Sequence, residues 1–481
     1  MHFGRFVCII LRGQFHKEVT NMNLVYGIND KPKFPQLLIF AFQQVLAILA
    51  ATIAVPAIIG NGMSQSAALF GAGMGTLIYQ LFTRFKSPVY LGSSFAFLGS
   101  MSAAFAGAAS GAAGHTGLMI GAAFAGLVYV IIALVIKFVG VNWIEKLMPP
   151  AVIGPTVAII GLSLAGNAIS DLSKGKVLSE ITTLVVQDGQ LAEKVELVPV
   201  CNPYVALICG LITLFAVILF SVYGKKMMKL IPFVLGILVG YSACAIFTVI
   251  GLVTDNPALQ ILDFSVFRNM DIFAIPDFSF LKTAEGIRDI DGAFLATLAV
   301  AYIPVAFVVF AEHIADHKNL SSVIGQDLLK DPGLHCTLLG DGVGSMVGAL
   351  FGGCPNTTYG ESVGCVAITR NASVVTITTA AIMCIVISFF GPFVTFLASI
   401  PNCVMGGVCV ALYGFIAVSG LKMVQKVDLG QSKNLFVVSV ILIAGIGKMS
   451  ISFGKVELTS IACALILGIV TNILVCKAKE N

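Results

Sequence analysis

Long apolar segments dominate this chain and limit what it can fold into. Of its 481 residues 58% are hydrophobic and 11% are charged, whereas a soluble domain carries about 25% charged residues. A helix needs roughly 20 apolar residues to cross the hydrocarbon core of a bilayer. Because the excess apolar surface must face lipid, we expect a polytopic membrane protein. The clear candidate spans are 34–59, 66–83, 116–140, 149–169, 203–223, 230–253, 292–317, 333–352, 372–398, 400–420, 432–448 and 456–476.

Two further segments, 88–107 and 353–370, are apolar enough for the membrane but are interrupted. Each begins with a proline and a few residues typical of strands, and continues with glycine and hydroxyl or acidic residues that suit the start of a helix. A helix of about 13 residues spans only about 20 Å. An extended stretch must therefore complete each crossing, and it must be buried in protein. We expect a short strand and a half-helix in each, which makes fourteen segments.

The distribution of basic residues supports this count. With the N-terminus inside and fourteen crossings, 20 of the 28 lysines and arginines lie on the inner side. Most of the others lie in two long loops, 170–202 and 254–291, which weigh less in the positive-inside rule. We expect a protein of the cell membrane with both termini in the cytoplasm.

The order of the segments indicates an inverted repeat. The interrupted segments are third and tenth of fourteen, and Pro149 and Gly154 of span five are echoed by Pro401 and Gly406 of span twelve. Repeats of seven spans insert with opposite topology, and paired interrupted helices in such repeats point to a binding site. The prediction is an all-α membrane protein with a first repeat at 34–253, an extracellular loop at 254–291 and a second repeat at 292–476.

The remaining composition excludes several classes of protein and site. Residues 1–33 are predicted to be a cytoplasmic extension, because no cleavage site follows the apolar patch within the first 21 residues. The net charge of +4 is too scattered for a nucleic-acid partner, and the twelve cysteines form no CxxC pair, so no metal or other cofactor is expected. The stretch Gly340–Gly344 suits close helix packing better than nucleotide binding.

Acidic residues lie inside the predicted spans. Glu312 and Asp316 are four residues apart and share one face of a helix. A charge at the bilayer centre costs roughly 2.5–3.5 kcal/mol on insertion scales, so it indicates a function. For Asp316 an alternative is that the span simply reaches the cytoplasmic headgroups, since His317 and Lys318 follow. Glu361 begins the second half-helix, where a carboxylate also complements the helix dipole.

Together these carboxylates predict a site for a planar ligand. Glu312 and Glu361 could clamp a flat molecule with two ring N–H donors, and a carboxylate in a dry pocket holds a proton more readily than one in water. We therefore expect a proton as the coupling ion. Phe95 and Tyr359 at the interruptions, and Tyr413 in span twelve, could stack on a heterocycle, although packing is the simpler role for any one aromatic residue.

At these residues the chain resembles the nucleobase/ascorbate transporter family, and within it the bacterial uracil permeases. The resemblance runs in order along nearly the whole chain, and PNTTYGE with the TR that follows it is its most specific signal. The matching stretches are QQVLAILAATIAVP (43–56), LGSSFAF (91–97), AEHIAD (311–316), KDPGLH (330–335), PNTTYGESVGCVAITR (355–370) and residues 404–420.

The resemblance implies seven plus seven inverted helices, with a core domain (spans 1–4 and 8–11) and a gate domain (spans 5–7 and 12–14). It also implies proton symport, often by a homodimer. Carried over by position, it implies substrate binding by Glu312, Glu361, Phe95, Tyr359, Gly360, Tyr413 and Ala51, and proton coupling by Glu312 and Asp316.

Three departures from the family pattern leave the substrate open. Asp316 stands where uracil permeases of the family often have histidine, Gln44 where many members have histidine, and Ser362 at the asparagine position of the signature. The signature favours uracil, and xanthine or uric acid is the alternative. An anion transporter would need a cationic site, but only Arg370 lies near the interruptions. An enzyme is not favoured, because Glu312 and His313 are its only candidate cluster and neighbours on a helix point apart. We predict a proton-coupled uracil symporter.

Overall fold

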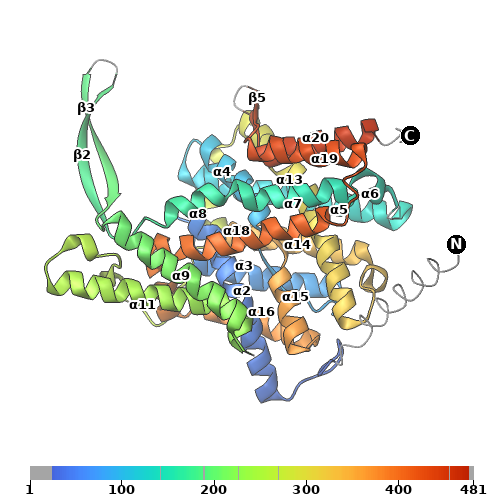
Figure 1. Ribbon diagram of the computed structural model, residues 1–481, viewed down its shortest axis with the longest axis horizontal. Coiled ribbons are helices and arrows are strands. Elements are labelled where there is room, and N and C mark those ends of the chain that lie inside the picture. Colours follow the sequence, from blue (N-terminus) through green and yellow to red (C-terminus); the bar gives the residue numbers. More distant parts are fainter. Residues whose placement is uncertain are drawn as a thin grey trace. The chain divides into compact units, whose positions relative to one another are not determined.

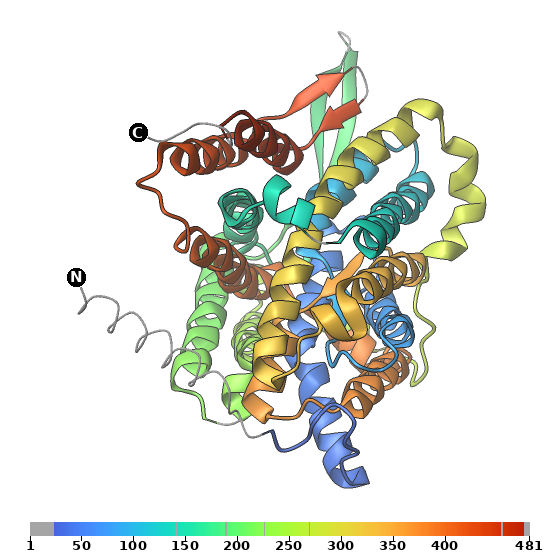
Figure 2. The same ribbon diagram turned by 90° about the vertical axis from the view of Figure 1, so that its right-hand side faces the viewer.

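The computed structural model of the protein (Figures 1 and 2) describes residues 24–140, 142–187, 190–225, 227–268, 270–453 and 456–475. Its chain divides into two compact units. The first comprises Met1–Ile159, Pro276–Ile387 and Ser419–Asn481, and the second comprises Ile160–Ile275 and Ser388–Val418. The cytoplasmic extension predicted at 1–33 lies outside the described residues as far as residue 23.

Long helices form most of the first unit, and α13 is the long yellow helix of Figure 2. The helices are α2 (Phe34–Ile59), α3 (Gln65–Phe82), α4 (Leu98–Gly107), α5 (Gly111–Val139), α6 (Asn142–Leu147), α12 (Thr283–Gly286), α13 (Gly292–Ile324), α14 (Leu334–Gly352), α15 (Gly360–Thr369), α16 (Val374–Ile387), α19 (Ser432–Ile446) and α20 (Ser460–Val475). Single helical turns are η1 (Phe95–Phe97), η4 (Ser279–Lys282), η5 (Ile287–Asp289) and η6 (Leu329–Gly333).

The second unit is also mainly helical. Its helices are α8 (Ala165–Asp171), α9 (Pro203–Tyr223), α10 (Met227–Leu230), α11 (Pro232–Val253) and α17 (Gly391–Ser399), with the turns η2 (Pro257–Leu259) and η3 (Phe264–Phe267). The division between the units falls within α7 (Pro150–Ser163) and α18 (Asn402–Val424).

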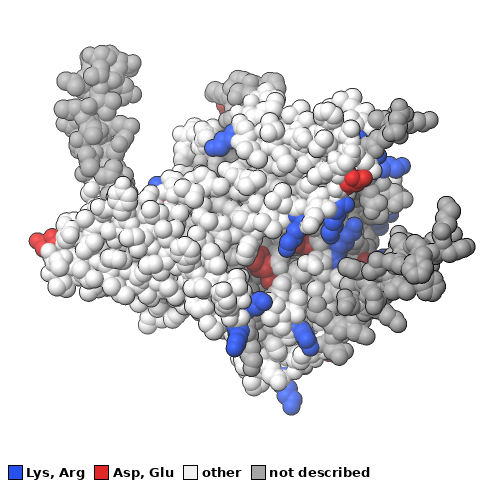
Figure 3. Space-filling model, in the orientation of Figure 1, with Lys and Arg blue, Asp and Glu red and all other residues white. Residues whose placement is uncertain are grey.

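Several helices are suited to a bilayer. Eight helices in the described ranges are long and apolar enough to cross a membrane, and α5 and α9 have the highest mean hydropathy of them, 2.7 and 2.8. Most of the surface in Figure 3 carries no charged side chain. The prediction of a mainly helical polytopic membrane protein is confirmed at this level.

The chain is mainly helical and not all-α, because the structure contains three two-stranded antiparallel pairs, of which only the first falls in the interrupted segments where short strands were expected. These are β1 (Leu91–Ser93) with β4 (Asn356–Thr358), β2 (Leu178–Gln187) with β3 (Gln190–Pro199), and β5 (Ile451–Phe453) with β6 (Val456–Leu458). The pair β2–β3 is the long green ribbon of Figure 1. It falls in the stretch that we expected to be a plain loop, 170–202. The signal was in the sequence, since β-branched residues such as Ile181, Thr182 and Val185 favour strands.

Small residues bring α3 and α14 of the first unit into close contact. A Cβ atom on Gly71 would lie 2.5 Å from the carbonyl oxygen of Gly348, and one on Gly344 would lie 2.7 Å from that of Gly75. Only glycine allows two backbones to approach this closely, as at many helix contacts in membranes. The interpretation of Gly340–Gly344 as a helix-packing stretch is therefore confirmed.

The described N-terminal segment is attached to the end of α15. The amides of Val25 and Tyr26 both donate to the carbonyl oxygen of Arg370, at 2.8 and 3.3 Å. In return the amide of Ala372 donates to Tyr26 O, and that of Val374 to Ile28 O. These bonds satisfy backbone groups that the ends of α15 and α16 leave open. Residues 24–28 thus fix the position of α15 in the first unit.

Candidate functional site

The pair β1–β4 places two distant parts of the chain side by side. Leu91 pairs with Thr358 and Ser93 with Asn356, and the amide of Ser94 donates to Pro355 O at 2.9 Å. The hydroxyl of Thr76 on α3 accepts a bond from the Leu91 amide at 2.9 Å, and its hydrogen lies between Ala72 O of α3 at 2.8 Å and Leu91 O at 3.2 Å. Both strands are fully buried, so each backbone polar group needs such a partner. The pair is therefore a fixed platform from which α15 and the turn η1 begin.

Tyr359 closes one side of this platform. Its hydroxyl donates to Ser93 O at 2.8 Å, its amide donates to Tyr90 O, and only 4% of the residue is exposed. Its ring covers Gly92 so closely that a Cβ atom there would lie 2.4 Å from the ring carbons. The absence of a side chain at residue 92 thus sets the position of the Tyr359 ring.

Three carboxylates converge next to the platform. Glu312 and Asp316 lie on α13, and Glu361 lies in the first turn of α15; each is partly buried. The negative charges of Asp316 and Glu361 both repel a negative charge on Glu312. Thr358 of β4 donates its hydroxyl to Asp316 Oδ2 at 2.9 Å. In the described ranges of the chain, none of the three is paired with a lysine or arginine. The site is therefore acidic, and its carboxylates can accept hydrogen bonds from cationic or N–H donor groups.

The other predicted site residues divide between the two units. Gly360 is exposed beside this cluster, since a Cβ atom on it would lie 3.8 Å from Asp316 Oδ1. Phe95 begins η1, which packs against α13, and Ala51 is buried in α2, which packs against β1 and α15. Tyr413 is buried on the second unit's part of α18. The first unit thus brings together every predicted site residue except Tyr413.

Two of the residues that depart from the family pattern contact each other. Gln44 Nε2 of α2 donates to the hydroxyl oxygen of Ser362 on α15, and the same oxygen accepts a bond from the Tyr90 amide at 3.0 Å. Gln44 and Ser362 are both buried. One hydroxyl therefore joins α2, the residue before β1 and the first turn of α15, directly after Glu361.

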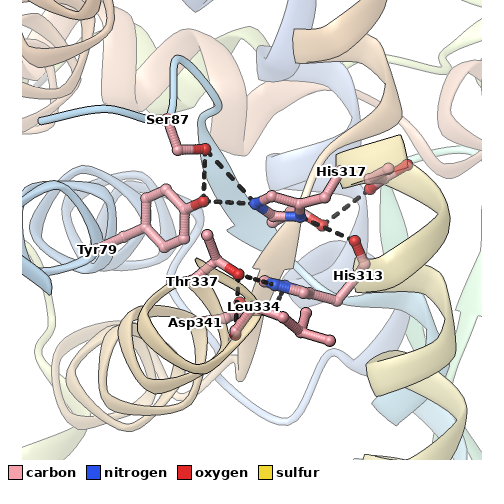
Figure 4. A network of polar contacts seen from close by, with 9 residues as sticks. Tyr79, Ser87, His313, His317, Leu334, Thr337 and Asp341 are labelled. Carbon is pink, nitrogen blue, oxygen red and sulfur yellow. Dashed lines mark hydrogen bonds and ion pairs between the residues drawn. The ribbon is translucent and has the colours of Figure 1, made fainter. Parts of the chain in front are cut away.

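The sequence interpretation missed a second polar cluster on α13, drawn in Figure 4. His313 and His317 are fully buried, whereas His317 had suggested that the span ends at the headgroups. His313 hydrogen-bonds Asp341 of α14, and His317 bonds Tyr79 of α3. The four-residue spacing of the histidines was the available signal, because it places both side chains on one helix face. The hydrogen-bond partners of the two histidines lie on other helices, so the spacing of the histidines could not identify them.

A metal site is not apparent at either cluster. Within the ranges that the structure describes, no group of three or more histidine, cysteine, aspartate or glutamate residues is arranged to hold a metal ion. The carboxylates of the first cluster can accept hydrogen bonds and exchange protons.

Comparisons with known proteins agree with this architecture. A family model described as a permease family matches residues 35–453. The chain is 38% identical to the uracil permease of Bacillus caldolyticus over 456 residues, which cover 94% of each protein. It is 36% identical to the uracil permease of Bacillus subtilis (strain 168), with 95% of this chain and 96% of the relative covered.

A solved structure gives independent support for the fold. The transmembrane domain of the cyanobacterial bicarbonate transporter BicA superposes with a TM-score of 0.56 at 16% identity, over 93% of this chain and 100% of that domain. An identity this low supports the fold alone. The family match and the full-length relatives together show that the chain belongs to the permease family, as a transporter rather than an enzyme.

Proposed function

We propose that this protein is a proton-coupled symporter that imports uracil. The observation that carries the proposal is the convergence of Glu312 and Glu361, from α13 and α15, beside the β1–β4 platform. The full-length relatives named uracil permease supply the substrate. Uracil is flat and has two ring N–H groups, which are donors for two carboxylates.

The three carboxylates also account for the coupling ion. Like charges that lie close together in a low-dielectric site cannot all be ionised cheaply, and no lysine or arginine of the described residues offsets them. Protons and the N–H groups of the substrate supply the positive charge and the hydrogen-bond donors that these carboxylates lack. In the proposed cycle Glu312 binds uracil and takes up the proton, Glu361 holds the opposite ring edge, and Asp316 stabilises the protonated state. Tyr359, Phe95, Gly360, Ala51 and Tyr413 would complete the site, and no cofactor takes part.

The finer architecture belongs to the same proposal. We assign fourteen segments in two inverted repeats of seven, with 88–107 and 353–370 as the interrupted pair. The strands β1 and β4, each followed by a ten-residue helix, α4 and α15, support this assignment. Spans 1–4 and 8–11 would form the core domain and spans 5–7 and 12–14 the gate domain. Both termini would be cytoplasmic in the cell membrane, and a homodimer is the expected assembly.

The test is uptake of radiolabelled uracil by cells that lack their own permease, with and without a protonophore. We expect the protonophore to abolish uptake, and the substitution Glu312→Gln to lower it at least tenfold. A hydrogen bond to a charged group contributes about 1.5–3 kcal/mol, and 1.36 kcal/mol corresponds to a factor of ten. The matched control is Glu285→Gln, which changes an exposed carboxylate of α12.

Unlabelled xanthine and uric acid serve as competitors in the same assay. Uptake of labelled xanthine without uptake of uracil would assign the site to a purine on the same scaffold. Full proton-dependent uptake by Glu312→Gln would contradict the role of this carboxylate.

A further inference from the structure

The face of α13 that carries His313 and His317 is separate from the face that carries Glu312 and Asp316. Neither imidazole is exposed, and their rings stack with centroids 4.0 Å apart (Figure 4). Most buried polar groups have hydrogen-bond partners, and the partners of these two histidines indicate where the protons lie. The cluster is not part of the proposed substrate site.

The partners of His313 indicate that it shares a proton with Asp341. The hydroxyl of Thr337 donates to Leu334 O at 3.1 Å, which leaves its oxygen to accept from His313 Nε2 at 3.0 Å. His313 Nδ1 lies 2.8 Å from Asp341 Oδ2, and this contact needs a proton between the two atoms. With Nε2 protonated as well, the pair His313–Asp341 holds a resident proton and is neutral overall.

The partners of His317 allow it to gain and lose a proton. Its Nδ1 lies 2.8 Å from the backbone oxygen of His313, a pure acceptor, so Nδ1 carries a hydrogen. Its Nε2 lies 2.7 Å from the Tyr79 hydroxyl, which lies 2.7 Å from the Ser87 hydroxyl. In the structure the Tyr79 hydroxyl donates to Ser87 Oγ, and rotation of the two hydroxyl groups would reverse the direction. If both donate toward Nε2, His317 is neutral; if both donate away from it, His317 is a cation.

These two states differ by one proton moved along three groups, which we call the His317–Tyr79–Ser87 chain. A proton that enters at Ser87 moves the hydrogen of Ser87 to Tyr79 and that of Tyr79 to Nε2, so each hydroxyl keeps one hydrogen. Ser87 is buried and directly follows Lys86, which is partly exposed in the turn after α3. The partly exposed Lys86 brings this end of the His317–Tyr79–Ser87 chain next to the solvent-facing turn, so protons would come from water there and return to it.

The charged groups around the His317–Tyr79–Ser87 chain come from several elements. Burial and the stacked ring of His313 oppose a positive charge on His317, whereas the carboxylates Asp341 and Asp316 act on Tyr79, its hydrogen-bond partner. Glu312 lies on α13 itself, and α15 contributes Glu361, which acts on Asp316. The turn η6 contributes Lys330 and Asp331, both exposed. Asp316 directly precedes His317 on α13, and the Tyr79 hydroxyl that Asp316 and Asp341 act on lies 2.7 Å from His317 Nε2. A positive charge on His317 therefore favours the ionised form of these carboxylates.

We propose that the His317–Tyr79–Ser87 chain is a second proton-binding site, whose proton promotes release of the coupling proton from Asp316 and Glu312. This inference rests on the proposed proton-coupled transport. Net uptake requires the coupling proton to leave the carrier. The positive charge on the protonated His317–Tyr79–Ser87 chain favours its release. Exchange of internal for external uracil does not require this step, because the carrier can return still loaded with uracil and proton.

The experiment compares these two modes in proteoliposomes that contain the purified protein. Net uracil uptake is driven by a pH gradient, and exchange is measured at equal pH on both sides, with the internal pH varied from about 5 to about 8, the range of histidine titration. For Tyr79→Phe and Ser87→Ala we expect net uptake to fall at least tenfold and to lose its dependence on internal pH. Exchange should stay within about twofold of the wild type.

The matched control is Tyr302→Phe, which removes a hydroxyl from an equally buried tyrosine of α13. No partner for that hydroxyl is found in the part of the chain that the structure describes. The control should retain both modes. Wild-type net uptake and pH dependence in Tyr79→Phe and Ser87→Ala would overturn the inference, and so would an equal fall of both modes, which indicates a structural role. If Tyr79→Phe fails to fold, Ser87→Ala decides by the same readouts. A wild type without proton-driven uptake would instead overturn the proposed function.

Discussion

At the scale of single residues, the site depends on groups that position the carboxylates as well as on the carboxylates. The Ser362 hydroxyl illustrates this, because it accepts bonds from Gln44 of α2 and from the Tyr90 amide while its own residue follows Glu361. A buried amide that loses its acceptor costs about 1–3 kcal/mol. The orientation of Glu361 therefore depends on a serine that does not need to contact substrate.

This contact predicts strong coupling between the two residues. We expect Gln44→Ala and Ser362→Ala each to weaken uracil binding, and the double substitution to cost less than the sum of the single ones. Residues in one hydrogen-bond network show interaction energies of about 0.5–3 kcal/mol. The measurement is the uracil Kd of the four proteins of a double-mutant cycle.

A control cycle combines Gln44→Ala with Ser110→Ala. Ser110 bonds Ala113 and Asp289 and shares no partner with Gln44, so additive effects are expected. Additivity in the Gln44–Ser362 cycle as well would show that the two side chains act independently.

At the scale of elements, pairing of the short strands β1 and β4 fixes the positions from which the helices α4 and α15 begin. Strands of three residues are too short to be stable alone. Here they are buried and joined to α3 through Thr76 and to α15 through Tyr359. The N-terminal segment around Tyr26 fixes the other end of α15 by backbone bonds. The helix that carries Glu361 is therefore held at both ends.

The contact of Gly92 with Tyr359 gives an element-scale prediction. Gly92→Ala places a Cβ atom 2.4 Å from the tyrosine ring. Because such overpacking costs about 1–3 kcal/mol and displaces the ring, we expect uracil affinity to fall about fivefold or more.

The matched control is Gly99→Ala on α4, where a Cβ atom would meet no other atom within 4 Å. Binding of uracil to each purified variant checks the prediction. Affinities that are equal in Gly92→Ala and Gly99→Ala would show that the ring position is not critical.

At the scale of the whole molecule, the described helices leave the membrane topology to be tested. Arg84, after α3, and Asp289, in η5, are both exposed. The fourteen-segment assignment places five crossings between them, whereas it would place four if the segment 88–107 did not cross. The two residues should therefore lie on opposite sides of the membrane.

Labelling tests this assignment directly. Arg84→Cys and Asp289→Cys are introduced one at a time into a cysteine-less protein, and intact cells are treated with a membrane-impermeant maleimide. We expect Asp289→Cys to react in intact cells and Arg84→Cys to react only after the membrane is opened. Reaction of both in intact cells would rule out the interrupted crossing.

The amino-acid sequence by itself determined the class of protein and the candidate carboxylates. Hydropathy and span length are local properties, so they indicated a helical membrane protein without knowledge of packing. The cost of a buried charge likewise singled out Glu312 and Glu361 on physical grounds. The hairpin β2–β3 could also have been expected, since its β-branched residues were visible in the sequence.

Only the tertiary structure decided which groups meet. The bond between Gln44 and Ser362 spans 318 residues of sequence, and those of His317 to Tyr79 and Ser87 span 238 and 230. Spacing within one helix places His313 and His317 on a common face but cannot identify what the neighbouring helices present to it. Hydrogen bonds depend on distance and direction between particular atoms, and for residues on different helices the packing of the chain alone sets both.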